Sequence, residues 1–111
     1  QLLSGLTAGA CGGIGGTYAV MPELYLAIYR LYQEGKIAQG REIQDTCCHI
    51  IYKLCSGKGN MYAMIKEVLR LNGGPDIGGV RKPLTDLLPE DKPIAQECAQ
   101  MVREALAKYV G

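Results

Sequence analysis

A chain of 111 residues with a formal net charge of +1 and 48% hydrophobic residues is typical of one globular domain, and this composition excludes a disordered chain. The near-zero charge removes any electrostatic reason to expect nucleic acid or an anionic membrane as a partner. No apolar run approaches the ~20 residues of a membrane-spanning helix, and the first four residues lack the basic start of a secretory signal.

The first expected elements are a short helix over residues 2–8 and a glycine-rich segment that follows it. Five of the eight residues from 9 to 16 are glycines. An interior glycine costs a helix ~1 kcal/mol relative to alanine, so this stretch cannot be helical. It can instead form a short buried strand over residues 12–16, where glycine marks the close approach of another group. Residues 1–21 thus precede the longer helices predicted next.

Four amphipathic helices are predicted after this unit, and they make residues 22–111 a helical bundle. Pro22 suits the first position of a helix, and Gly35 suits the left-handed residue that ends it. Apolar residues recur at steps of three and four in all four predicted helices. These helices span residues 22–34, 38–55, 61–71 and 94–109. A loop rich in glycine and proline covers residues 76–93. The predicted fold class is therefore mostly α.

Cysteine and histidine residues give no strong sign of a metal centre or of nucleophilic catalysis. Cys47, Cys48, His49 and Cys55 lack the CxxC or HxxxH spacing that lets four ligands converge on zinc, so no metal site is predicted. His49 is the only histidine, and no feature places a serine or a thiol beside it. The five cysteines are an odd number at irregular spacings, which favours reduced thiols and a cytoplasmic location.

Phosphate binding and imine chemistry are not favoured either. Tyr18 stands where a GxGxxG loop needs its third glycine, and no GxxxxGK[ST] motif occurs, so a tight structural turn is favoured over a ligand cradle. All seven lysines fall in predicted loops, caps or polar helix faces, whereas an imine-forming lysine needs an apolar setting. No catalytic residue is therefore predicted. Arg81 could clamp a carboxylate, although a tie between loop and helices is favoured.

Two stretches of the sequence resemble the N-acetylneuraminate lyase / dihydrodipicolinate synthase family. The first is SGL followed by AGACGGIGGTY, between Ser4 and Tyr18, and the second is YAMIK at Tyr62 followed by GVRKPL at Gly79. The Gly-Gly-Ile-Gly-x-Thr-Tyr form is more similar to the neuraminate lyase branch. The likeness covers nearly the whole chain.

The resemblance implies a C-terminal fragment of a (β/α)8 barrel. Residues 1–21 would then correspond to the end of the seventh helix and the eighth strand, and residues 22–111 to the last barrel helix and the family's C-terminal helical bundle. A complete barrel takes ~250 residues, and the absence of an initiator methionine agrees with a piece of a longer protein. The family's imine-forming lysine and catalytic tyrosine would lie on earlier strands, outside this chain. We expect residues 1–19 to be disordered, rearranged or paired with another copy, because a lone strand leaves backbone groups unpaired. Apolar surface left uncovered favours a homo-oligomer.

Ile14 and Gly16 are the two substrate-binding residues that the resemblance implies. Ile14 would lie at the end of the eighth strand, near the pyruvate portion of the substrate. Gly16 takes the place of a serine whose hydroxyl contacts the sugar-acid chain in typical neuraminate lyases, and a glycine cannot make that contact. The predicted parent is a pyruvate-dependent class I lyase or aldolase acting on a 2-keto acid without a further cofactor, and this chain alone is expected to be inactive.

Two alternatives stay open. Within the family, the reaction can be a dihydrodipicolinate synthase-like condensation of pyruvate with an aldehyde. Outside it, the chain can be a non-catalytic helical interaction module. Its binding face would then be the stripe of Tyr25, Tyr29 and Tyr32, which is otherwise interpreted as core or subunit interface.

Overall fold

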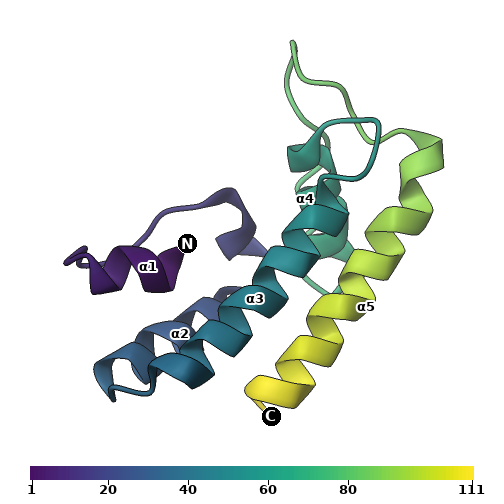
Figure 1. Cartoon of the computed structure of the whole chain (residues 1–111). Coiled ribbons are helices and arrows are strands. Elements are labelled where there is room, and N and C mark those ends of the chain that lie inside the picture. The colour runs from purple at the N-terminus through teal and green to yellow at the C-terminus, as the bar shows by residue number, and fades with distance from the viewer.

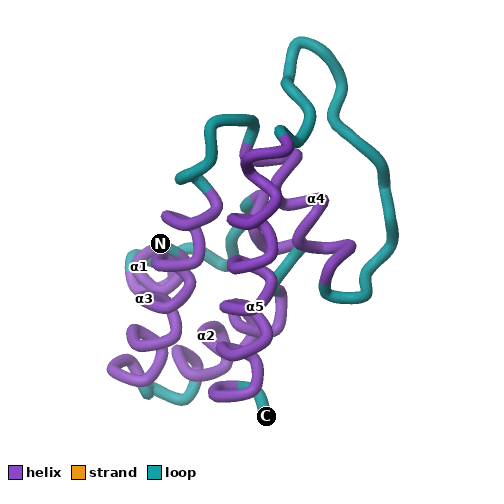
Figure 2. Tube along the Cα trace, turned by 90° about the vertical axis from the view of Figure 1, so that its right-hand side faces the viewer, coloured by secondary structure: helices purple, strands orange, loops and turns teal.

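Five helices and two short 3-10 turns make up the computed structural model, which describes all 111 residues and contains no β-strand (Figures 1 and 2). Each predicted helix is confirmed, and the observed bounds lie within two residues of the expected ones. In chain order the elements are α1 (Leu2–Thr7), η1 (Gly16–Ala19), α2 (Pro22–Gln33), α3 (Ile37–Leu54), α4 (Met61–Leu71), η2 (Pro89–Asp91) and α5 (Lys92–Tyr109).

The helix ends follow the local signals in the sequence. Pro22 is the first residue of α2, where its missing N–H costs no helical hydrogen bond. Gly35 has φ of +74°, and beyond it the N–H of Lys36 donates to the carbonyl of Leu31 at 2.8 Å. Asn60 caps α4, because its Oδ1 accepts a hydrogen bond from the N–H of Tyr62 at 2.8 Å. The predictions for Pro22 and Gly35 are confirmed.

The long helices α3 and α5 form the centre of the molecule, with α2 packed against α3 and α4 packed against α5 (Figure 1). The buried side chains of all five helices join one hydrophobic cluster. Gly40 is buried where the helices approach closely, since a Cβ there would lie 3.5 Å from a methyl of Leu3 and 3.8 Å from the Cβ of Leu31. No helix is both long and apolar enough to span a membrane.

Helix α1 is docked on the bundle, so the expectation that residues 1–19 are disordered is wrong for this helix, whereas pairing with another copy stays a prediction. Leu2, Leu3 and Leu6 are 9%, 5% and 2% exposed and belong to the same hydrophobic cluster as the longer helices. The N–H of Leu3 also donates to Oε1 of Gln44 on α3 at 2.6 Å. The burial of three leucine side chains offsets the conformational entropy that is lost when so short a helix becomes ordered. The division of the chain into residues 1–21 and 22–111 stays a prediction.

The buried strand expected over residues 12–16 is not formed. Gly15 is extended, with φ of −163° and ψ of 149°, but the segment joins no ladder and its residues are exposed. The N–H groups of Gly12, Gly13 and Ile14 make no hydrogen bond within the chain. A strand exists only with a partner, and no other segment here is extended beside it. Gly15 therefore has the backbone conformation of a strand, but no sheet forms.

Candidate functional site

The glycine-rich segment lies flat on an aromatic ring. A Cβ on Gly13 would stand 2.6 Å from the hydroxyl oxygen of Tyr18, and one on Gly15 would stand 3.0 Å from Cε1 of the same ring. Ile14, between them, projects the other way and is fully exposed. This alternation is the period of two expected of an extended chain. The glycines at 13 and 15 are therefore required by packing against Tyr18, which agrees with a structural turn rather than a phosphate cradle.

The Tyr18 ring stacks on a tyrosine of α2, and hydroxyl hydrogen bonds surround this pair. The rings of Tyr18 and Tyr25 stack with centroids 3.9 Å apart, and the Tyr25 hydroxyl is hydrogen-bonded to Oγ1 of Thr17 at 2.7 Å. Burial raises the pKa of Tyr25 to about 12, so its phenol stays protonated at neutral pH. The hydroxyl of Tyr29 donates to the carbonyl of Cys11 at 3.3 Å. Two tyrosines of α2 thus support the glycine-rich segment, Tyr25 through its stack on Tyr18 and Tyr29 through its bond to Cys11.

Gly16, the second predicted site residue, lies against the first turn of α4. A Cβ on Gly16 would stand 3.0 Å from Cε1 of Tyr62 and 3.7 Å from Cδ1 of Ile65. The Tyr62 side chain is 49% exposed, so its ring covers Gly16 on one side and faces solvent on the other. Sequence analysis missed Tyr62 as a site residue. The available signal was its place off the apolar stripe of α4, where an aromatic side chain has no core to enter.

The exposed side of the segment combines free backbone donors with an apolar surface. A hollow of about 400 Å³ lies beside it, and its lining includes Leu2, Gly13, Ile14, Tyr18 and Ile51. No lysine, histidine or carboxylate lines this hollow. Free N–H groups next to an apolar surface can bind an oxygen acceptor, either a ligand carboxylate or the carbonyls of a neighbouring strand. The chain therefore offers binding groups here, together with the hydroxyls of Thr17, Tyr18 and Tyr25, but no lysine that could form an imine.

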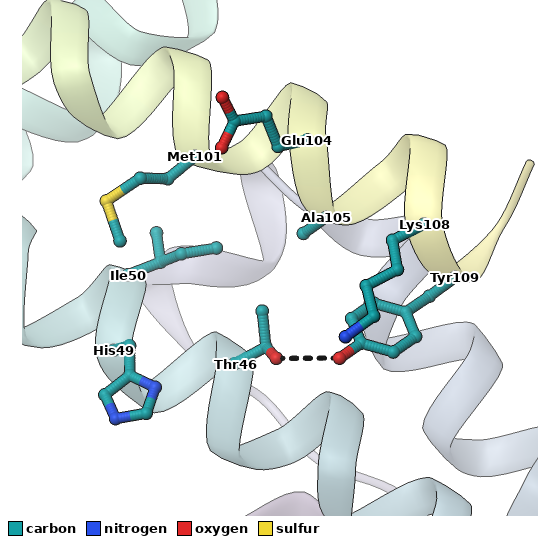
Figure 3. Close-up of a pocket in the computed structure, with 8 residues that line it drawn as sticks. All are labelled: Thr46, His49, Ile50, Met101, Glu104, Ala105, Lys108 and Tyr109. Atoms are coloured by element: carbon teal, nitrogen blue, oxygen red, sulfur yellow. Dashed lines mark hydrogen bonds between the residues drawn. The ribbon is translucent and has the colours of Figure 1, made fainter.

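A second hollow, of about 290 Å³, lies between α3 and α5 (Figure 3). The hydroxyl of Tyr109 is 3.2 Å from Oγ1 of Thr46 and donates to Oε1 of Glu42 at 2.9 Å. Lys108 forms an ion pair with Glu42 at 3.1 Å, which lowers the pKa of the carboxyl. The neighbouring Tyr109 hydroxyl, and after it Glu42, raise the pKa of the Lys108 amine. His49 lies on the rim of this hollow, with no serine or thiol in its lining. The polar groups at this end of the hollow are satisfied by one another.

The metal-ligand candidates, the cysteines and Arg81 do not form a functional site. No three His, Cys, Asp or Glu side chains are grouped so that they could hold a metal ion. All five cysteines are free, and burial raises the pKa of Cys47 to about 12 and that of Cys98 to about 11, which keeps both thiols protonated. Arg81 is exposed and makes no ion pair or side-chain hydrogen bond, so the predicted tie between loop and helices is not formed.

Comparison with known proteins places this arrangement in a family. Residues 1–104 match the dihydrodipicolinate synthetase family. The N-acetylneuraminate lyase of Mediterraneibacter gnavus is 49% identical over 99% of this chain, and that of Citrobacter koseri is 37% identical over 87% of it. The chain covers 35% and 33% of these two proteins, so it spans about a third of the length of the curated relatives it matches.

Solved structures agree with the sequence relatives. Wild-type sialic acid aldolase from Ruminococcus gnavus superposes with a TM-score of 0.95 at 50% identity, over 98% of this chain and 36% of that one. A catalytic lysine mutant of the same aldolase superposes with a TM-score of 0.93 over 96% of this chain and 35% of that one. The five helices correspond to the C-terminal helical part of a barrel aldolase. With 104 of its residues matched, this chain belongs to the dihydrodipicolinate synthetase family.

Proposed function

We propose that this chain supplies the C-terminal third of a pyruvate-dependent class I aldolase of the N-acetylneuraminate lyase type. The observation that carries the proposal is the 49% identity to a protein named N-acetylneuraminate lyase, which extends over 99% of the chain. The lack of any lysine in the hollow beside the glycine-rich segment agrees with it. The lysine that forms the imine with a 2-keto acid would lie outside these 111 residues, in a cytoplasmic homo-oligomer that needs no further cofactor.

In this proposal the segment from Gly12 to Gly16 becomes the last strand of the barrel. Its free N–H groups then pair with neighbouring strands, which removes the cost of leaving them without partners. Ile14 projects from the face opposite the helices, so it would border the pyruvate portion of the substrate. Gly16 and the exposed edge of the Tyr62 ring would border the rest of the substrate.

Trapping of the imine tests the proposal on the full-length protein that carries this sequence. Incubation with pyruvate and borohydride should add one reduced pyruvate per chain, and peptide mapping should place it on a lysine outside residues 1–111. The isolated 111-residue chain is the matched control and should acquire no adduct. Failure of the full-length protein to form the adduct would refute the aldolase and favour a non-catalytic interaction module.

The direction of the reaction separates the two branches of the family. A lyase should release pyruvate from N-acetylneuraminate, whereas a synthase-like enzyme should consume pyruvate only when an aldehyde is supplied. The 49% and 37% identities to proteins named N-acetylneuraminate lyase favour cleavage. Consumption of pyruvate with an aspartate-derived semialdehyde, without cleavage of N-acetylneuraminate, would instead favour condensation.

A further inference from the structure

Asp91 is a buried carboxylate that the proposed chemistry does not use. Its exposed fraction is 2%, and Thr17 is the only other buried polar residue. Asp91 precedes α5 at the N-cap position, where an aspartate ordinarily accepts a hydrogen bond from the N–H groups of its own helix. It makes no such bond. Its two oxygens instead accept hydrogen bonds from the N–H groups of Lys58 at 3.0 Å and Gly59 at 2.7 Å.

The turn between α3 and α4 is shaped around this carboxylate. A Cβ on Gly57 would stand 2.8 Å from Oδ2 of Asp91, and one on Gly59 would stand 3.1 Å from the same oxygen. Any side chain at either position would push the carboxylate away from the two N–H groups. Both glycines therefore leave room for Asp91, and two charge-assisted hydrogen bonds join the start of α5 to a turn 32 residues earlier.

The same turn leads directly to the candidate site. Asn60 follows Gly59 and caps α4 through the N–H of Tyr62, whose ring lies against Gly16. The turn and the start of α5 lie at the same end of the bundle (Figure 1). The position of the Tyr62 ring thus depends on where α4 begins, and the beginning of α4 depends on the turn that Asp91 holds.

We propose that Asp91 is a positioning residue that sets the place of Tyr62 beside Gly16, and so the fit of the part of the substrate distant from pyruvate. This inference rests on the proposed aldolase function. A displacement of about 1 Å in a group that positions a substrate can cost up to ~100-fold in rate, so a moderate but selective effect is expected. Imine formation with pyruvate should be unaffected, because Asp91 reaches only the Tyr62 side of the site.

The test is Asp91→Asn in the full-length protein, with Asp86→Asn as the matched control. Asp86 also accepts a backbone hydrogen bond, from the N–H of Val80 at 2.8 Å, but in an exposed loop. Asp91→Asn keeps the shape of the side chain but replaces one acceptor oxygen by an NH2 group. That group faces the N–H of Lys58 or Gly59, so one of the two hydrogen bonds is lost. We expect KM for N-acetylneuraminate to rise about tenfold, with the rate of pyruvate trapping unchanged. Asp86→Asn should leave both unchanged.

A double-mutant cycle shows whether the effect passes through Tyr62. In a Tyr62→Ala background, Asp91→Asn should change KM less than twofold, because the group that it positions is already absent. Full additivity would overturn the inference, as would an equal fall in pyruvate trapping and in cleavage. If Asp91→Asn does not fold, Gly57→Ala is the second variant, because its added methyl group displaces the same carboxylate. It should also raise KM for N-acetylneuraminate, and an unchanged KM would overturn the inference. A wild-type protein that forms no pyruvate adduct refutes the proposed function instead.

Discussion

Replacement of Leu6 by alanine tests whether α1 and the four longer helices unfold as one unit. Leu6 is 2% exposed and lies in the same hydrophobic cluster as α2 and α3. Truncation of a buried leucine to alanine costs about 2–5 kcal/mol, which includes the cavity that it leaves. Helix α1 has only six residues and no side-chain cap, so it can settle partly into the space. We therefore expect a loss of about 2–3 kcal/mol from the free energy of unfolding.

Urea denaturation of the 111-residue chain, followed by circular dichroism at 222 nm, measures this loss. Leu26→Ala is the matched control, because Leu26 on α2 is 68% exposed and the substitution is the same. It should change the free energy of unfolding by less than about 0.5 kcal/mol. A change equally small for Leu6→Ala would refute the reasoning. Residues 1–21 would then behave as a unit separable from residues 22–111, as the sequence predicts.

Three further predictions concern buried polar groups. Burial raises the pKa of Cys47 and of Tyr25 to about 12, so both groups stay protonated in the folded chain at a pH where they ionise in the unfolded chain. The free energy of unfolding should therefore fall as pH rises from about 9 to 12. Cys47→Ala should flatten that slope in urea titrations at each pH, and Cys11→Ala, at an exposed site, should not. Tyr25→Phe should lower stability by about 1 kcal/mol through loss of the Thr17 hydrogen bond, and it should cost much less when Thr17 is already valine. In thiol titrations without denaturant, the exposed Cys11 and Cys55 should react fast, whereas Cys47 and Cys98 should react only after unfolding; equal rates for all would contradict the packing.

The helices could be predicted because their signals are local. Pro22, Gly35 and Asn60 each act within a few residues of their own position, and the predicted bounds follow from them. The periodicity of apolar residues likewise identified Ile43, Cys47, Ile50 and Leu54 as the buried face of α3. Both kinds of signal depend only on neighbours in sequence, so a single chain displays them without any knowledge of its tertiary contacts.

The contacts that build the candidate site could not be predicted, because they join residues far apart in sequence. Asp91 carries the local signature of an N-cap, with Pro93 two residues later, yet its carboxylate binds a turn 32 residues earlier. The residues Ser56-Gly57-Lys58-Gly59 indicate locally a break between two helices and carry no sign of a distant partner. The strand predicted over residues 12–16 is not formed, because a strand requires hydrogen-bonding partners from other segments and this chain contains none.

The two faces of the glycine-rich segment explain why its sequence is ambiguous. On one face, Gly13 and Gly15 must lack side chains because the Tyr18 ring stands against them, and Tyr18 is fixed in turn by its stack on Tyr25. On the other face, Ile14 is fully exposed beside backbone N–H groups that have no partner within the chain. Glycines demanded by aromatic packing are indistinguishable in sequence from glycines demanded by a ligand. The packing occupies only the first face, so the proposed function assigns the second face, with its unpaired N–H groups, to the substrate and the neighbouring strands.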